Sequence, residues 1–295
     1  MTDTRSAQLP RPHRSRSGTF LGLSAWMCAV AAAFAFSCGR WAFAALGSFV
    51  TVTLHPLGKG THRDRRLVDS VSLHAQEESI GVQELSAPEA DHNSYQESVF
   101  DQKAGIFAGP GATPPAVVPR MHRIARACQL DDQTSILDAA TGTGALLPFY
   151  EAEGGSLSAV TGVDISDGMM GYARKRFPDA TFIKSDILKF SDPSGIRFDR
   201  VIFNACFGNF WDQRLLLQHV GSSLISEGGL VVISHPLGRQ WLEKLRSQDP
   251  RMVRHPLPAL EELKRLLEVS APTLSIVSFD DEDDYYCAVL QQREH

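Results

Sequence analysis

The stretch ILDAATGTG at residues 136–144 decides the fold of this chain. A short apolar run, 135–138, ends at Asp138 and passes into a turn that contains Gly142 and Gly144. Glycine allows the backbone to approach a ligand closely. The next segment, 145–153, has a helical pattern, and a helix N-terminus offers free amides and a partial positive charge. The sequence therefore predicts a ligand site where this strand ends.

Strands and helices alternate after this turn. Further strands are expected at 157–164, 180–184, 198–204 and 230–234, and helices at 167–177, 212–225 and 260–269. Two last strands, at 273–279 and 285–291, are joined so closely by the acidic turn 280–284 that they cannot both run parallel. We therefore expect an α/β fold with helices on both faces of a doubly wound, mostly parallel seven-stranded sheet, completed by an antiparallel C-terminal hairpin strand.

A second acid, Asp164, ends the next expected strand, twenty residues after Gly144. An acid there accepts hydrogen bonds from a ribose diol, so the pair of turns predicts a cofactor that contains a nucleoside. A dinucleotide site requires a third glycine, where this chain has Leu147. Asp138 would also oppose the charge of a pyrophosphate. An acid at that position suits a cationic ligand such as S-adenosylmethionine, which carries an amino group and a sulfonium.

Five stretches resemble, in order and spacing, the class I S-adenosylmethionine-dependent methyltransferases. They are residues 136–144, 161–166, 184–188, 198–210 and 226–236. The resemblance covers about residues 121–291. It implies S-adenosylmethionine as cofactor and a Rossmann-like sheet that ends in an antiparallel hairpin strand.

The resemblance also implies a cofactor site that draws on several strand ends. Its members are Asp138, Ala140, Thr141, Gly142, Gly144, Asp164, Ile165, Asp186, Ile187, Asn204 and Phe207. The first turn would surround the methionine part, Asp164 would hold the ribose hydroxyls, and Asp186 with Ile187 would face the adenine amino group. Ala140 departs from the family, which usually has glycine there.

Each of these side chains also has a structural interpretation. Asp138 could cap a helix, Asp164 could be a solvated strand end, and Asp186 could cap a turn. Phe207, Phe210 and Trp211 could be core packing. The functional alternative for one of these three aromatic rings is a cation–π contact with the sulfonium.

Asn204 and His235 are predicted to take part in methyl transfer. Asn204 and Phe207 would lie near the reacting methyl group by resemblance, and Asn204 is a catalytic candidate. His235 follows the strand 230–234 near the expected acceptor and is the candidate general base, because histidine exchanges protons near neutral pH. The alternative for His235 is a structural role in turning the chain. Tyr95 is expected in a lid over the pocket.

Composition bears on metals and partners. The turn 280–284 lacks the spacing of an EF-hand, and the cysteines show no C-x-x-C pairing, so no metal site is expected. Residues 77–295 carry 20 basic and 31 acidic side chains, a balance that disfavours nucleic acid as partner.

The tetrapeptide after the fourth expected strand bears on the methyl acceptor. Asn204-Ala205-Cys206-Phe207 departs from the N-P-P-aromatic form of enzymes that methylate amino groups. A small-molecule acceptor is favoured, among them a quinone, a pigment precursor or a lipid-like compound.

Two other functions remain open at this stage. One is an NAD(P)-dependent oxidoreductase, and the other is a non-catalytic S-adenosylmethionine-binding interaction protein. The sequence predicts neither the atom that is methylated nor the oligomeric state.

The first 76 residues have the composition of a targeting presequence. A basic start, the uncharged stretch 17–39 and Ala33-Phe34-Ala35 match a signal peptide, and the basic segment that follows suits a transit peptide. The two in series resemble the bipartite presequences of plastid proteins, so a plastid (chloroplast) location is expected, with a mature start between Phe36 and Asp91. The alternative is a membrane anchor at 17–39. Residues 77–120 are expected to form a linker and lid segment, and 121–295 the catalytic domain.

Overall fold

The computed structural model describes residues 89–294. The predicted presequence and membrane anchor, and the first part of the linker, lie outside the described residues. Among the helices of residues 89–294, none is both long enough and apolar enough to cross a membrane.

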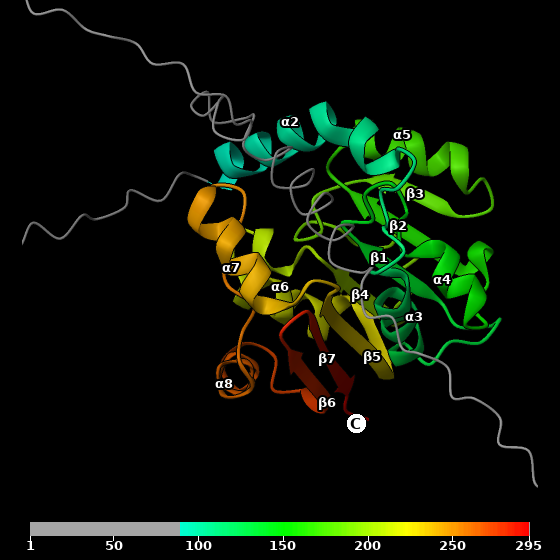
Figure 1. Cartoon of the computed structure of the whole chain (residues 1–295). Coiled ribbons are helices and arrows are strands. Elements are labelled where there is room, and N and C mark those ends of the chain that lie inside the picture. Colours follow the sequence, from blue (N-terminus) through cyan, green and yellow to red (C-terminus); the bar gives the residue numbers. More distant parts are fainter. Residues whose placement is uncertain (1–88, 295) are drawn as a thin grey trace, which may run out of the picture.

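Within the described residues, the strands form one seven-stranded sheet in the order β3-β2-β1-β4-β5-β7-β6 (Figure 1). The strands are β1 (Ile136–Ala139), β2 (Val160–Asp164), β3 (Thr181–Lys184), β4 (Phe198–Asn204), β5 (Ile225–His235), β6 (Leu274–Glu282) and β7 (Tyr285–Gln292). The first five pair in parallel, and β7 enters antiparallel between β5 and β6. The predicted mostly parallel sheet with an antiparallel C-terminal hairpin is confirmed.

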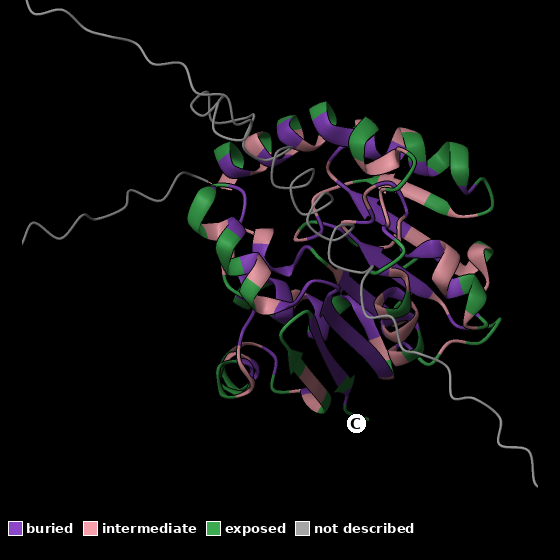
Figure 2. Ribbon diagram, in the orientation of Figure 1, coloured by how far each residue is buried: buried purple, intermediate pink, exposed green. Residues whose placement is uncertain are grey.

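Alternating residues of the central strands are buried on opposite faces of this sheet. In β4, Val201 and Phe203 belong to one apolar cluster and Ile202 to the other. The same alternation runs through β5 and β7, and Figure 2 shows these strands as almost wholly buried. Burial on both faces explains why the strands read as continuous apolar runs.

Helices cover both faces. They are α2 (Glu89–Ala108), α3 (Val118–Ala127), α4 (Leu147–Ala152), α5 (Asp167–Arg176), α6 (Gln213–His219), α7 (Gly238–Gln248) and α8 (Leu260–Ser270). Helices α3 and α4 supply apolar side chains to one cluster, and α6, α7 and α8 supply the other. Helix α2 packs beside α5 (Figure 1).

Several elements differ from the sequence expectations. The expected strand 157–164 begins with a 3₁₀ turn at 157–159, and the expected helix 212–225 ends at His219 in a π-helical turn, 220–224. Helix α7 was not expected, and the segment expected as linker and lid contains the 20-residue helix α2. Both helices depend on tertiary packing: α7 buries Leu242 and Leu245 in the core, and α2 lies on α5.

Candidate functional site

A cavity of about 220 Å³ lies where β1, β2 and β4 end. Its wall comes from three sources: the glycine turn after β1, the ends of β2, β3 and β4 with the turns that follow them, and one side of α2. This is the edge at which open α/β sheets bind ligands.

The turn after β1 is held in a left-handed backbone conformation at three positions. Ala140, Gly142 and Gly144 have φ of 51°, 57° and 73°. A Cβ on Gly144 would meet the Phe177 ring at 2.7 Å, so both backbone and space require glycine there. Ala140 takes the same conformation with a side chain, which is strained for an L-residue. Alanine at this position, where glycine is usual in the family that the sequence resembles, therefore raises the free energy of the turn.

Asp138 lies buried beneath this turn. Its Oδ2 accepts a hydrogen bond from Thr141 Oγ1 at 2.6 Å, and its Oδ1 accepts one from Tyr150 OH at 3.0 Å. Burial raises the pKa of Asp138 to about 6, although both hydrogen bonds lower it. The carboxylate does not cap a helix. It shapes the turn and lines the cavity, where a cationic ligand would favour its charged form.

Asp164 ties β2 to the same turn. Its Oδ2 accepts a hydrogen bond from the Gly142 amide and its Oδ1 from the Ser166 amide, both at 2.8 Å. Only 8% of Asp164 is exposed, so it is not a solvated strand end. Burial raises its pKa, and the backbone amides oppose that shift. The structure thus fixes a carboxylate in the cavity wall, and Ile165 lines the cavity beside it.

Asp186 caps a turn, as one of its two interpretations predicted, and it also lines the cavity. Its Oδ1 accepts a hydrogen bond from the Leu188 amide at 3.0 Å, which caps the turn after β3. Its Oδ2 accepts a hydrogen bond from Asn93 Nδ2 on α2 at 2.9 Å. Both Asp186 and Ile187 line the cavity.

The end of β4 supplies one predicted residue and not the other. Asn204 lines the cavity, and its Oδ1 accepts a hydrogen bond from Ser234 Oγ at 3.1 Å. Phe207 does not line the cavity. It is buried against Phe203 edge to face, and Phe210 lines the wall in its place. The cofactor role of Phe207 is corrected to core packing, while Gly144 supports the turn from outside the wall.

His235 is not at the cavity. Its ring is buried, its Nδ1 accepts a hydrogen bond from the Leu237 amide at 3.1 Å, and it lies 5.3 Å from the Trp241 ring. Burial lowers its pKa to about 3. A nitrogen that already accepts a backbone hydrogen bond inside the core has no access to an acceptor. The prediction of His235 as general base is therefore corrected, and its structural interpretation holds.

Sequence reasoning missed the contribution of α2 to the wall. His92, Asn93, Gln96 and Phe100 line the cavity, and Phe107 follows near the end of the helix. The only signal in the sequence was the expected lid before the first strand. Tyr95, named for that lid, instead donates a hydrogen bond to Asp249 at 2.8 Å and does not line the cavity.

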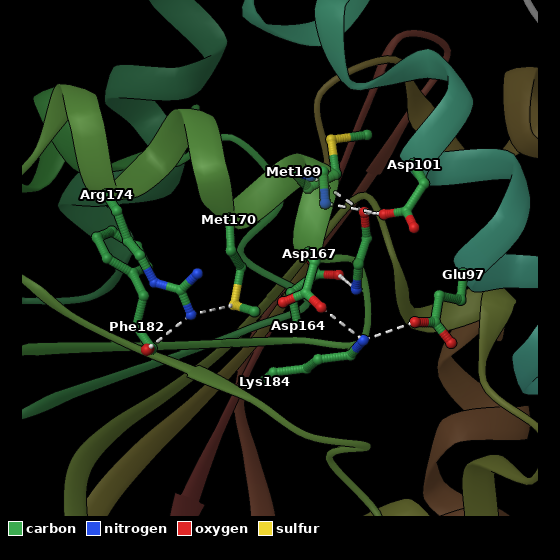
Figure 3. A network of polar contacts seen from close by, with 11 residues as sticks. Glu97, Asp101, Asp164, Asp167, Met169, Met170, Arg174, Phe182 and Lys184 are labelled. Atoms are coloured by element: carbon green, nitrogen blue, oxygen red, sulfur yellow. Dashed lines mark hydrogen bonds and ion pairs between the residues drawn. The ribbon is translucent and has the colours of Figure 1, made fainter.

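Polar contacts join α2 to β3 and to the start of α5 (Figure 3). Asp101 accepts hydrogen bonds from Ser166 Oγ at 2.6 Å and from the Gly168 amide at 2.9 Å. Lys184 on β3 bridges Glu97 at 2.7 Å and Asp167 at 2.8 Å. Because the Ser166 amide also bonds to Asp164, the helix and the predicted ribose acid share one neighbour.

The structure also places the residues considered for metal binding. No cluster of three or more histidine, cysteine or acidic side chains that could hold a metal ion occurs within residues 89–294. Three acids of the β6–β7 region, Asp280, Glu282 and Asp284, pair with arginines of α3. Cys128, Cys206 and Cys287 are free and buried.

Comparison with known proteins shows what this domain is similar to. Residues 136–228 match the family model described as a methyltransferase domain. A demethylmenaquinone methyltransferase from Thermotoga maritima is 36% identical over 100 residues, which are 33% of this chain and 42% of that protein. An N,N-dimethyltransferase for a dTDP-trideoxy amino sugar, from Streptomyces venezuelae, is 37% identical over 24% of this chain and 28% of that protein. The chain thus matches less than half the length of these relatives.

Two solved structures share the fold. A Haloferax volcanii methyltransferase in complex with the activator Trm112 has a TM-score of 0.53 at 15% identity, covering 68% of this chain and 98% of that chain. The Burkholderia thailandensis 1,6-didemethyltoxoflavin-N1-methyltransferase, with its acceptor and S-adenosylhomocysteine bound, has a TM-score of 0.53 at 15% identity, covering 70% of this chain and 92% of that one. The chain therefore shares the fold of these solved methyltransferase structures.

Proposed function

We propose that this protein is an S-adenosylmethionine-dependent methyltransferase that acts on a small-molecule acceptor. The observation that carries the proposal is the hydrogen bond from the Gly142 amide to the buried Asp164 carboxylate, with Asp138 beneath the same left-handed turn. Two acids around one glycine turn fit a ligand with a ribose diol and positive charge. They do not fit a pyrophosphate, so an oxidoreductase is disfavoured.

The residues of the chain bind and orient the reactants. In this proposal, Asp164 accepts hydrogen bonds from the ribose hydroxyls, Asp138 lies beside the cationic methionine part, and Asp186 faces the adenine amino group. When bound, S-adenosylmethionine supplies a methyl group activated by its positive sulfur. Alignment in a cavity closed by α2 supplies the main catalytic effect, because in-line displacement depends on orientation.

Two observations support a small acceptor. Much of the cavity wall is apolar, with Phe100, Phe107 and Phe210 among its side chains. Both curated relatives, and the Burkholderia thailandensis protein of the same fold, are named for small acceptors. A quinone, a pigment precursor or a lipid-like compound suits such a wall.

The proposal is tested by thermal unfolding of the full chain with S-adenosylmethionine, S-adenosylhomocysteine, NADH or NADPH. Ligand at a hundredfold its Kd adds about 2.7 kcal/mol, which raises Tm by roughly 5–10 °C for a domain of this size. We expect the rise with the two adenosyl ligands only. Asp164→Ala should abolish it, while Asp192→Ala in the exposed loop before β4 should keep it. A rise with a nicotinamide alone would overturn the proposal.

We further propose that the protein works in a plastid after removal of its presequence. The basic, Ser/Thr-containing composition of residues 1–76 supports this proposal. Sequencing the N-terminus of the native protein should give a first residue between Phe36 and Asp91. An intact Met1 would contradict it.

A further inference from the structure

Helix α2 presents two polar side chains to the cavity one turn apart, His92 and Gln96. Both line the wall, and they are only 5% and 3% exposed. Residues four apart lie on the same face of a helix. The proposed cofactor residues do not include either of them.

The protonation of His92 follows from its one hydrogen bond. Its Nε2 lies 2.7 Å from the backbone oxygen of Asn209. A carbonyl oxygen only accepts, so Nε2 must carry the hydrogen, and the neutral ring then has a bare Nδ1. No residue within 89–294 forms a hydrogen bond to that Nδ1.

Gln96 offers a second acceptor. Its Nε2 donates hydrogen bonds to the backbone oxygens of Arg251 at 3.3 Å and Met252 at 2.6 Å. Its Oε1 is buried and has no hydrogen-bond partner in the described part of the chain. A buried carbonyl oxygen without a partner is unfavourable, so a ligand that donates a hydrogen bond would be favoured here.

The surroundings specify the rest of such a ligand. Phe100 and Phe107 lie 6.2 Å apart between ring centroids, and Phe210 also lines the cavity. The post-β4 segment 205–210 holds Asn209, the partner of His92, and begins directly after Asn204. Resemblance places Asn204 near the reacting methyl group, so His92 faces the acceptor end of the cavity.

We propose, building on the proposed function, that the methyl acceptor is an apolar ring compound with a hydroxyl group and that His92 receives the hydroxyl proton. The hydroxyl oxygen forms its new bond to the methyl carbon as the carbon–sulfur bond breaks, and that electron pair stays on the sulfur. The proton passes to Nδ1, and the imidazolium then releases it to solvent. The product is a methyl ether.

The electrostatic setting keeps His92 neutral before the reaction. Burial lowers its pKa below 6.5, and the positive charges of Arg254, His255 and Arg251, in the segment after α7, lower it further. The Asn209 carbonyl opposes this shift and would stabilise the imidazolium. A neutral ring near pH 7 is the form that accepts a proton.

The tautomer gives a test that needs no substrate. In the full chain labelled with ¹⁵N-histidine, the signals that disappear in His92→Phe belong to His92. We expect the neutral Nε2–H tautomer at pH 7.5. A neutral ring protonated at Nδ1, or a ring still charged at that pH, would overturn the proposal.

Binding of model compounds tests the substrate class. With S-adenosylhomocysteine bound, the full chain should bind 2-naphthol about tenfold more tightly than 2-methoxynaphthalene, which lacks the donor. His92→Phe should reduce this preference to about twofold or less, and His122→Phe, on α3 outside the cavity, should retain it. Unchanged preference in His92→Phe, or equal binding of the two probes by the wild type, would refute the inference. Failure of S-adenosylhomocysteine to bind would instead refute the proposed function.

Discussion

Ala140 has a backbone conformation that is unfavourable for a residue with a side chain. It has a φ of 51° in the turn that carries the site. A side chain in this left-handed conformation costs about 1–2 kcal/mol compared with a right-handed one. The chain retains alanine in a position that glycine would occupy without strain, so this turn is less stable than it could be.

We therefore expect Ala140→Gly to stabilise the fold by about 0.5–1 kcal/mol, a gain reduced by the larger entropy of glycine in the unfolded chain. Urea denaturation measures it. The control is Ala173→Gly in the middle of α5, which should destabilise by about 1 kcal/mol or more because glycine weakens a helix interior. Loss of stability in Ala140→Gly would show that the alanine methyl group contributes more packing than strain.

His235 titrates in a way that links folding to pH. Its folded pKa is about 3, well below the 6.5 of an unfolded chain. Below pH 6.5 the unfolded state therefore binds a proton that the folded state does not, so this histidine makes stability fall as pH drops from about 6.5 towards 3.

His235→Phe retains a ring beside Trp241 and removes this titration. We expect the loss of stability between pH 7 and pH 5 to be about 2 kcal/mol smaller in the variant than in the wild type. Denaturation at the two pH values measures the difference. Turnover per folded molecule should be unchanged, and an equal pH dependence of stability in both proteins would contradict the buried neutral histidine.

Helix α2 is the element whose position decides whether the cavity is closed. It is joined to α5 through Asp101, to β3 through Glu97 and to the turn after β3 through Asn93. The Asp101 carboxylate accepts the Gly168 amide in the first turn of α5, where a negative charge is also favoured by the helix dipole. These contacts make the helix a cover that depends on a few polar bonds.

Asp101→Ala should release α2 without unfolding the sheet. We expect faster hydrogen exchange of the amides in 89–108 and a Kd for S-adenosylhomocysteine raised by roughly three- to tenfold, the effect of losing about 1 kcal/mol of binding free energy. Hydrogen-exchange mass spectrometry and calorimetry give the two values. The control is Asp91→Ala, which removes an exposed acid of the same helix. If the amides of 89–108 exchanged equally fast in Asp101→Ala and in Asp91→Ala, the Asp101 contact would not be what holds the helix.

In the whole molecule, the last strand of the chain is inserted into the sheet and does not lie at its edge. β7 lies between β5 and β6, and its Ala288 and Leu290 belong to the same apolar cluster as Val201 and Phe203 of β4. The outer strand β6 reaches the rest of the sheet only through β7. The C-terminal residues are therefore part of the core.

A chain that ends at Asp284, without β7, should fail to fold cooperatively, because several fully buried side chains are lost, at about 2–5 kcal/mol each. A chain that ends at Gln292 keeps the strand and should unfold within a few degrees of the full chain. Circular dichroism during heating distinguishes them. A cooperative transition in the shorter chain would show that the sheet does not need its inserted strand.

The sequence by itself determined the order of the strands, the glycine turn and the acids Asp138, Asp164 and Asp186 at the cavity. These are local properties: apolar runs mark buried strands, and parallel strands bring their carboxyl ends to one edge. Only the tertiary structure decided that Phe210 rather than Phe207 lines the wall and that His92 rather than His235 faces the cavity. The direction of a side chain depends on which distant segment packs against it, and α2 is held over the strand ends by contacts with residues 36 to 156 positions away.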